Sequence, residues 1–371
     1  MKRSSTAMRA ALATGFCIGC AAMAGENAMK ISVREETMSG ERAVILENSF
    51  FKSVIIPGKA MFPATYFYKP SGHDVFFRRE TMEQSFLSLD GFFDCLPWVG
   101  DSRKRGASKG LLKTAAWQTD ARVDGGVATL AFRTVISYPD FTTGRTTELA
   151  FAKTMVASEK HAQLRMDYEI ENKGRDKARF IMVGHARVAA GGKYDRGDYI
   201  YAPGTNCWVT EFKWPALDKL GVKPYSWTPW PIEGVVDFAP KEGPEKKGDS
   251  VYAFVPASWS VIGDEKSREY VLFHYSPVQL GKAIMRQPFA CILHRDNDYL
   301  LEISLSRDID AKNWDEPWAT ASLAPGEKAQ FTVYMTPGQG LVKADFEKVT
   351  QVTPDRLVIG GASGREIKLA D

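Results

Sequence analysis

The stretch ATLAFRTVISY, residues 128–138, alternates apolar and polar side chains along most of its length. A period of two is typical of a β-strand with one buried face, because successive side chains of a strand point to opposite faces of the sheet. The same alternation recurs in residues 164–170. Turn-forming residues such as Asp124-Gly125-Gly126 and Asn172-Lys173-Gly174 separate these runs. This part of the chain therefore predicts long antiparallel strands.

Further runs of strand-forming residues are spread over the rest of the chain: residues 180–187, 251–255, 258–262, 270–275, 289–294, 299–306 and 330–335. Helical periodicity is confined to residues 341–349. Many strands with almost no helix favour an all-β, antiparallel sandwich or barrel over a βαβ fold. No internal repeat or low-complexity linker is found, so we predict one domain over residues 30–371, with the charged segment 237–248 as an exposed excursion.

The composition is that of an ordinary globular protein, with 44% hydrophobic and 25% charged residues. The net charge of +3 gives no support for a nucleic-acid partner held by bulk electrostatics. The sequence has no phosphate-binding G-x-x-x-x-G-K-[ST] loop, no G-x-S-x-G nucleophile turn and no H-x-x-E-H metal motif. We therefore expect neither a cofactor nor a metal, and nothing in the sequence indicates the oligomeric state.

The first residues have the pattern of an export signal. A basic start precedes a small, apolar run at residues 10–22, and Ala22-Met23-Ala24 supplies a small-x-small cleavage site. Residues 1–24 are thus expected to be a signal peptide that sends the protein to the periplasm or the exterior. An alternative is a lipoprotein signal cut before Cys20, because Ile18-Gly19-Cys20 is half of a lipobox. The apolar run is too short to span a bilayer, and no later run is long enough.

Three cysteines remain after the signal segment: Cys95, Cys207 and Cys291. They are too few and too scattered for a disulfide framework or a metal knuckle, so at most one bridge can form. Buried thiols are the simplest expectation.

Three stretches carry the functional signal, and they occur in a fixed order. The first is DGFFDCLPWVG at residues 90–100, followed by KGLLKTAAW at residues 109–117. The second is FIMVGHAR at residues 180–187, and the third is YLLEIS at residues 299–304. The third stretch continues to LAPGE and then FTVYM, which ends at residue 335.

Taken together, these stretches resemble the aldose 1-epimerase and hexose-phosphate mutarotase families of the galactose mutarotase-like superfamily. The C-Φ-P-W-Φ-G element is similar to residues 95–100, and the H-G-x-x-[RK]-x-x-x-W element is similar to residues 109–117, with Lys109 in place of the family's His. The strand with a lone His after an N-x-G turn and the L-x-E strand before a PGE turn are also present. The resemblance spans most of residues 42–336 and implies a large antiparallel β-supersandwich.

The resemblance implies acid/base chemistry on a sugar hemiacetal. In the family, a base takes the proton of the C1 hydroxyl while an acid protonates the ring oxygen, after which the open aldehyde rotates and the ring recloses. By position, the base is Glu302 and the acid is His185. This chemistry needs two groups with suitably tuned pKa values, which we expect on opposite sides of one sugar ring.

The residues themselves leave structural alternatives open. The alternation of side chains places Glu302 on the strand face opposite Leu301 and Ile303. That face lines a groove in the functional interpretation and is an ordinary solvated sheet face in the structural one. A lone His on an apolar strand is also typical of a hydrogen-bonded structural residue. Gly184 favours a close approach by a ligand or by backbone at this point.

Lys109 is the main departure from the family pattern. A lysine supplies a positive charge and hydrogen-bond donors but is a poor proton shuttle near neutral pH. Either turnover is lost and sugar binding kept, or Lys109 pairs with an anionic substituent of the sugar. The basic residues nearby suit an anionic ligand, although a solvated basic loop without a ligand is the simpler explanation for them. The substrate-binding residues expected around the site are Asp94, Trp98, Arg78, Lys113, Trp230 and Trp314.

Aromatic residues supply a second sugar-binding signal, because the apolar faces of pyranose rings stack on aromatic planes. Residues 207–230 are rich in Trp and Pro and are expected to form a rigid, non-strand lip, with Trp314 and Trp318 as a second wall. For any single Trp, anchoring a loop onto the core is an equally good explanation.

Three functions are therefore considered for an exported protein with a sugar or oligosaccharide ligand. The leading hypothesis is an aldose 1-epimerase-like isomerase with Glu302, His185 and Lys109 as catalytic residues. The second is a catalytically silent carbohydrate-binding protein, for which Lys109 is the lost catalytic group. The third is a glycoside hydrolase or lyase, or an accessory to such a system. Hydrolysis requires a second carboxylate, and the sequence offers no clear one, with Asp94 as the remaining candidate.

Overall fold

The computed structural model describes residues 30–77, 90–98, 101–102, 107–108, 110–140, 142–193, 197–210, 221–232, 252–295, 298–307, 315–361 and 364–370. The predicted signal peptide, the segment 237–248 and the site residues Arg78, Lys109 and Trp314 lie outside this part of the chain. Within it, no helix is long and apolar enough to cross a membrane.

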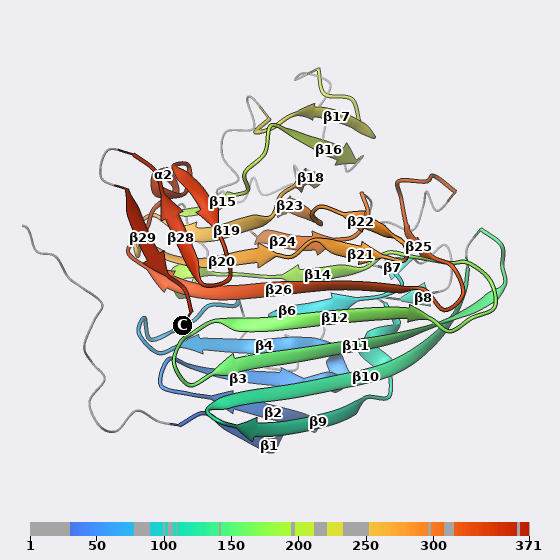
Figure 1. The fold of residues 1–371 in the computed structure, drawn as a ribbon, viewed down its shortest axis with the longest axis horizontal. Coiled ribbons are helices and arrows are strands. Elements are labelled where there is room, and N and C mark those ends of the chain that lie inside the picture. Colours follow the sequence, from blue (N-terminus) through green and yellow to red (C-terminus); the bar gives the residue numbers. More distant parts are fainter. Residues whose placement is uncertain are drawn as a thin grey trace, which may run out of the picture.

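Two large antiparallel sheets packed face to face hold most of the described chain (Figure 1). Sheet 1 has the strand order β1 (Ser32–Met38), β2 (Glu41–Glu47), β3 (Phe51–Ile56), β4 (Met61–Tyr68), β6 (Phe92–Cys95), β14 (Val183–Ala186), β24 (Asp298–Ser304), β23 (Phe289–Arg295), β18 (Tyr252–Pro256), β16 (Asn206–Thr210) and β17 (Ser226–Pro229), with β5 (His73–Asp74) paired to β4. Neighbours in this order come from distant parts of the sequence, so the sheet assembles residues that the chain keeps apart.

Sheet 2 covers the inner face of sheet 1. Its order is β15 (Asp198–Tyr201), β19 (Trp259–Asp264), β20 (Glu269–Tyr275), β26 (Lys328–Gln339), β12 (Leu164–Asn172), β11 (Thr146–Ser158), β10 (Val127–Pro139) and β9 (Gln118–Asp124), with β21 (Val278–Leu280) and β22 (Ala283–Met285) beside it. The alternation of residues 128–138 and 164–170 is realised in β10 and β12, where every second side chain is buried along most of the strand. The predicted all-β supersandwich class is confirmed.

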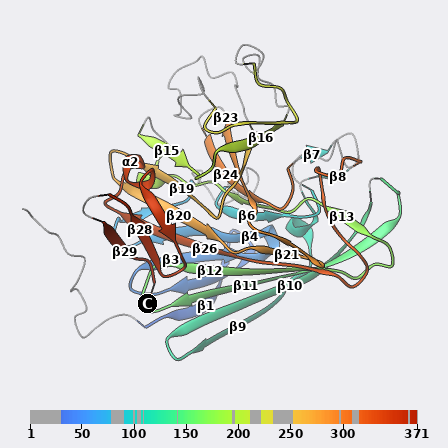
Figure 2. The same ribbon diagram turned by 45° about the horizontal axis from the view of Figure 1, so that its top comes forward.

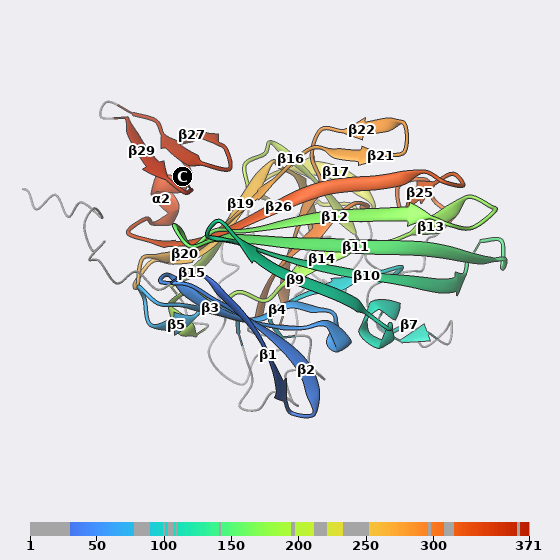
Figure 3. The ribbon, with the colours of Figure 1, turned by 60° about the horizontal axis from the view of Figure 1, so that its bottom comes forward.

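Smaller elements complete the fold. They are β7 (Asp101–Ser102) with β8 (Ala107–Ser108), β13 (Ala178–Phe180) with β25 (Ala321–Leu323), the three-stranded sheet β27 (Val349–Val352), β28 (Arg356–Ile359) and β29 (Arg365–Lys368), the helix α2 (Lys343–Phe346), and the 3-10 turns η1 (Pro57–Lys59), η3 (Leu111–Thr114) and η4 (Ala190–Gly192). The helix predicted at residues 341–349 is thus a single turn. It lies with β27 to β29 beside the β15–β19–β20 end of sheet 2 (Figure 3), where they share a separate apolar cluster that includes Trp259, Phe346 and Leu357.

Two predicted elements differ from the structure. Residues 180–187 do not form one strand, because Ile181 and Met182 interrupt the pairing between β13 and β14. The prediction that residues 207–230 contain no strand is wrong, since β16 and β17 lie at its two ends and pair with each other. Figure 2 shows β16 rising with β23 and β24 on one side of the sandwich.

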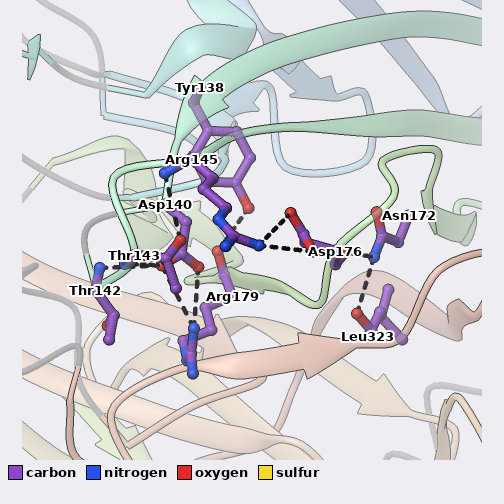
Figure 4. A network of polar contacts seen from close by, with 9 residues as sticks. All are labelled: Tyr138, Asp140, Thr142, Thr143, Arg145, Asn172, Asp176, Arg179 and Leu323. Atoms are coloured by element: carbon purple, nitrogen blue, oxygen red, sulfur yellow. Dashed lines mark hydrogen bonds and ion pairs between the residues drawn. The ribbon is translucent and has the colours of Figure 1, made fainter.

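A polar network fixes the chain just before β14 (Figure 4). Asn172 closes the predicted N-x-G turn by accepting the Gly174 amide at 2.9 Å, and its own amide group donates to the carbonyl oxygens of Asp176 and Leu323. The hydroxyl of Tyr138 donates to the carbonyl of Arg179 at 2.6 Å, while the Arg179 guanidinium contacts Asp140 at 3.3 Å. These bonds tie the ends of β10, β12 and β25 to β13, so the entry into β14 has one defined path.

A buried ion pair joins the two sheets through their shared core. Lys153 on β11 donates to Asp94 on β6 at 2.8 Å, and neither side chain is exposed to solvent. The Asp94 carboxylate also accepts the hydroxyl of Tyr168 at 3.1 Å, and the Lys153 ammonium lies 4.7 Å from the ring centre of Phe92. Burial lowers the pKa of Lys153 to about 8 and raises that of Asp94. Each charge is therefore tolerated mainly because the other is present.

This pairing predicts a strongly non-additive effect on stability. Asp94→Leu leaves an uncompensated buried ammonium and is expected to lower the free energy of unfolding by about 3–5 kcal/mol. The double variant Asp94→Leu/Lys153→Met removes both charges and should recover most of that loss. Urea unfolding of the wild type, both single variants and the double variant measures the coupling. Simple addition of the two single losses would contradict a dependence of each charge on the other.

Candidate functional site

His185 and Glu302 are direct neighbours on adjacent strands of sheet 1. In the antiparallel register of β14 and β24, His185 pairs with Glu302, and the imidazole Nε2 lies 3.5 Å from a carboxylate oxygen. Both residues are almost wholly buried, with exposed fractions of 6% and 1%. The separation across a sugar ring that the sequence suggested is not found; the two groups lie side by side on one face.

The opposite face of these strands belongs to the core. Leu301 and Ile303 flank Glu302 and are buried, as the alternation predicts. A Cβ atom on Gly184 would lie 3.1 Å from the ring of Phe92 and 3.6 Å from Asp94, both in the space between the sheets. A larger residue at position 184 would therefore need the Phe92 ring to shift by a few tenths of an ångström, and this side of Gly184 packs against the core.

Three other residues surround the imidazole on the outer face. Phe93 pairs with His185 from β6, and the two rings stack with their centres 4.2 Å apart. Lys113, in η3, places its ammonium 5.3 Å from the centre of the Phe93 ring. Arg187 follows His185 by two residues, so it shares the outer face, and it is held by an ion pair with Asp90 and by stacking on Phe77.

This environment keeps His185 uncharged. Burial, and then the positive charges of Arg187 and Lys113, lower the pKa of His185 to about 3. The imidazole is thus neutral near neutral pH, with one nitrogen as a donor and the other as an acceptor. Its Nδ1 is buried and has no hydrogen-bond partner within the described chain. The charge of Lys113 also acts on Cys95, the next outward residue of β6, whose pKa is raised by burial.

The structure brings some of the predicted substrate-binding residues to this face and not others. Lys113 lies on this face, close to Phe93 and His185. Asp94 points into the core toward Lys153, Trp98 is buried with its ring edge-on to Tyr138, and Trp230 is buried with its indole N–H donating to a backbone carbonyl at 3.1 Å. These last three are held by contacts within the core, so they are not part of the outer-face cluster.

Two residues that the sequence did not single out complete the cluster. Arg187 belongs to the stretch that led to His185, and period-two parity alone would have placed both on one face. Phe93 could not be assigned to a face from the sequence, because it follows another phenylalanine and both are fully buried, so the two side chains do not alternate between apolar and polar. The cysteines agree with the simplest expectation: Cys95 and Cys207 are buried, free thiols, and burial raises the pKa of Cys207 to about 12.

Two surface hollows lie elsewhere, on sheet 2. The first hollow has a volume of about 470 Å³ and lies on the outer face of sheet 2, where Arg133, Glu169 and Gln330 are among its lining residues. The other, of about 430 Å³, lies where the β10–β11 and β11–β12 ends meet Pro354 and Asp355, in the turn between β27 and β28. Their carboxylates and amides are largely paired with one another, as in the contacts of Glu169 with Lys328 and Gln330 at 2.7 Å. Neither hollow contains His185 or Glu302.

Solved structures identify the fold. A galactose mutarotase-like protein from Clostridium acetobutylicum is 11% identical with a TM-score of 0.58, and the match covers 84% of this chain and 99% of that one. A galactose mutarotase related enzyme from Lactobacillus acidophilus is 14% identical with a TM-score of 0.55, covering 81% and 99%. Galactose 1-epimerase from Lactobacillus acidophilus NCFM is 11% identical with a TM-score of 0.51, covering 84% and 100%.

This chain therefore has the galactose mutarotase-like fold, as its sequence motifs indicated. No protein-family model matches the sequence, and the comparison with curated proteins gives no match.

The low pKa of His185 predicts a specific acid sensitivity. An unfolded histidine titrates near pH 6.5, whereas folded His185 does so near 3, so the unfolded chain alone takes up this proton between those values. The contribution of His185 to stability is complete above pH 6.5 and is lost as the pH falls toward 3. Urea unfolding at pH 7 and pH 5 should show a smaller drop for His185→Gln than for the wild type.

The exposed, uncharged Ile284 provides the control for this measurement. Ile284→Ala removes no titratable group and should leave the wild-type drop between pH 7 and pH 5 unchanged. Equal drops for the wild type and His185→Gln would show that the buried imidazole is not held neutral.

Proposed function

We propose that the protein is an exported carbohydrate-active protein in which His185 and Glu302 form an acid/base pair for interconverting the anomers of an aldose. The observation that supports this most directly is their 3.5 Å contact on the outer face of sheet 1, within a galactose mutarotase-like fold. Export rests on the pattern of residues 1–24, which is tested by the mass of the mature protein after cell fractionation.

The side-by-side geometry suits the reaction. The C1 hydroxyl oxygen and the ring oxygen of a hemiacetal are bonded to the same carbon, so the groups that serve them must also be close together. One proton held between His185 and Glu302 is sufficient for this reaction. The group that carries the proton donates it to one sugar oxygen, and the other group accepts a proton from the other sugar oxygen. Glu302 as base and His185 as acid is the arrangement in which the proton starts on the imidazole.

The electrostatics favour a sugar with an anionic substituent. Arg187 and Lys113 both oppose protonation of His185. A carboxylate or sulfate placed against these cations offsets their field and favours the imidazolium that an acid catalyst requires. With a neutral sugar, the imidazole stays in its neutral form and is a weaker acid. We therefore propose hexuronic acids or sulfated aldoses as the preferred substrates.

The low pKa of His185 supports a second candidate function, that of a carbohydrate-binding protein without turnover. An imidazole with a pKa of about 3 is poorly matched to proton transfer near neutral pH. In this case the cluster of Phe93, Lys113 and Arg187 would bind an acidic sugar, and His185 would act only as a hydrogen-bonding group. Turnover therefore has to be measured separately from binding.

Removal of the carboxylate separates the two functions. For an enzyme, Glu302→Gln keeps the shape of the site and removes the base, so it should slow catalysed anomer interconversion by about 10²–10⁴-fold. Freshly dissolved α-galacturonic acid, glucuronic acid, galactose and glucose, followed by polarimetry and magnetisation-exchange NMR, provide the measurement. Calorimetric titration of each sugar at equilibrium reports binding.

Glu169→Gln, on the outer face of sheet 2, is the matched control and should retain the wild-type rate. If every sugar interconverts at the uncatalysed rate with the wild type but an acidic sugar still binds, the binding function is correct and the enzymatic one is not. The absence of both catalysis and binding across the panel contradicts a carbohydrate-active site here.

A further inference from the structure

The outer face of sheet 1 continues from Glu302 to a second cluster of side chains along one cross-strand row. The backbone register pairs Glu302 with Cys291, Cys291 with Phe254, Phe254 with Trp208, and Trp208 with Trp227. Directly paired residues of a sheet project from the same face. Trp208 and Trp227 therefore lie on the face that carries His185 and Glu302, toward the β17 edge (Figure 1).

The row fixes how far apart the two clusters are. Adjacent strands lie about 4.8 Å apart, so three steps from β24 to β16 place Trp208 about 14 Å from Glu302, and a fourth step places Trp227 about 19 Å away. These distances exceed the width of one sugar ring. A monosaccharide bound at Glu302 would not touch Trp227. Because the intervening Phe254 is fully buried, a chain of linked sugar rings that reaches Trp227 has to pass over the atoms that cover Phe254.

The second cluster consists of three indoles, a phenol and a guanidinium. Its members are Trp208, Tyr225, Trp227, Arg307 and Trp318, hereafter the aromatic–arginine cluster. Trp208 contacts Trp318 and Trp227 at ring-centre distances of 5.1 and 5.8 Å, and Tyr225 contacts Trp318 at 5.3 Å. Arg307 lies over Trp208 at 4.5 Å and over Trp227 at 5.6 Å.

The cluster differs from aromatic packing that only seals a core. Trp208 is 8% exposed and forms its floor, but Trp227 at the sheet edge is 46% exposed. A large aromatic ring that is nearly half exposed and held against fixed neighbours presents an apolar plane to solvent. Such planes stack on the C–H faces of pyranose rings at little entropic cost, because the ring is already ordered.

The charge of Arg307 indicates what the bound ring carries. Arg187 has an acidic partner in Asp90, but no ion pair links Arg307 to a carboxylate within the described residues. Its backbone N–H donates to the carbonyl of Trp318 at 3.1 Å, which holds the residue at the cluster. A guanidinium that lies over indoles, with no ion pair to a carboxylate among the described residues, has N–H donors to offer to a planar or tetrahedral anion. A carboxylate or sulfate on a sugar supplies that anion.

We propose that this face binds an acidic oligosaccharide, with its reducing-end ring at His185 and Glu302 and a later ring on the aromatic–arginine cluster. The inference rests on the proposed function for the first ring. It adds a second subsite, built from Trp227 and Arg307, and a substrate class, oligosaccharides that carry carboxylates or sulfates at both ends of the bound stretch. Cations at the two ends of the row, Lys113 with Arg187 and then Arg307, match that pattern.

A length series tests the second subsite. Oligogalacturonates from the monomer to the hexamer are titrated against the wild-type protein by calorimetry. Affinity should rise by about tenfold or more at the length that first spans from Glu302 to Trp227, since a stacked ring with a charge-assisted contact contributes at least this much. Trp227→Ala and Arg307→Gln should each remove most of this step while leaving monomer binding unchanged.

Ligand chemistry is resolved by two further series. Neutral β-1,4-galacto-oligosaccharides of the same lengths should show a smaller step, which Trp227→Ala removes and Arg307→Gln does not. Sulfated galacto-oligosaccharides distinguish the two anions, because a larger step with either one identifies the group that Arg307 binds. Ile284→Ala and Arg133→Gln, exposed residues of the other sheet, are the matched controls and should behave as the wild type.

The outcomes for the two proposals are distinct. A monomer that binds and depends on Glu302, together with affinity that does not change with length, overturns the oligosaccharide subsite alone. A length step that is unaffected by Trp227→Ala and Arg307→Gln overturns the assignment to this cluster. If neither monomer nor oligomer binds, the proposed function fails, and the subsite fails with it.

Discussion

The register of three short strands, β6, β14 and β24, is the constraint on which the rest of the site depends. It pairs Phe93 with His185 and His185 with Glu302, and so decides which side chains face the core and which face outward. A shift of one residue in this pairing would turn the imidazole into the sandwich and bring Gly184 to the surface. The packing of Phe92 against Gly184 opposes that shift, because the side chain of a larger residue would crowd the ring. A structural contact on the inner face thereby favours the observed arrangement of His185 and Glu302 on the outer face.

The same strands carry two charged clusters with opposite roles. On the inner face, Asp94 and Lys153 are sealed, paired at 2.8 Å and ringed by aromatic side chains, so each charge is satisfied within the protein. On the outer face, Lys113 and Arg187 act on His185 strongly enough to hold its pKa near 3. Asp90 and Glu302 supply carboxylates to the same cluster, so Lys113 and Arg187 are the groups with which an anionic ligand would interact beside a neutral imidazole. The contrast explains why Asp94, an attractive candidate in the sequence, belongs to the core and not to the site.

Much of the fold could be predicted from the sequence because its long strands alternate cleanly. Residues 128–138 and 164–170 gave β10 and β12, and parity around Glu302 was correct because Leu301 and Ile303 flank it. Parity was unreadable in β6, where Phe92, Phe93, Asp94 and Cys95 are all buried, so the direction of Asp94 could not be known. Proline and tryptophan masked β16 and β17. Arg307 lies beyond the end of β24, in a loop whose position follows from tertiary contacts and not from periodicity.

The contact between His185 and Glu302 changes what kind of site the sheet presents. Two groups on opposite walls would define a closed pocket for one ring. Two groups side by side belong to a row of paired residues that runs across the strands, and this row continues over the neighbouring strands on both sides. Along that row, Phe93 and Lys113 lie on one side of the pair, and the indoles of Trp208 and Trp227 lie on the other. An antiparallel sheet repeats its outward positions at every strand, but Phe254, between Glu302 and Trp208, is fully buried, so the described outward side chain most open to solvent in this row is Trp227 at the edge. The second subsite proposed above would therefore select an oligosaccharide that reaches this edge over a free monosaccharide.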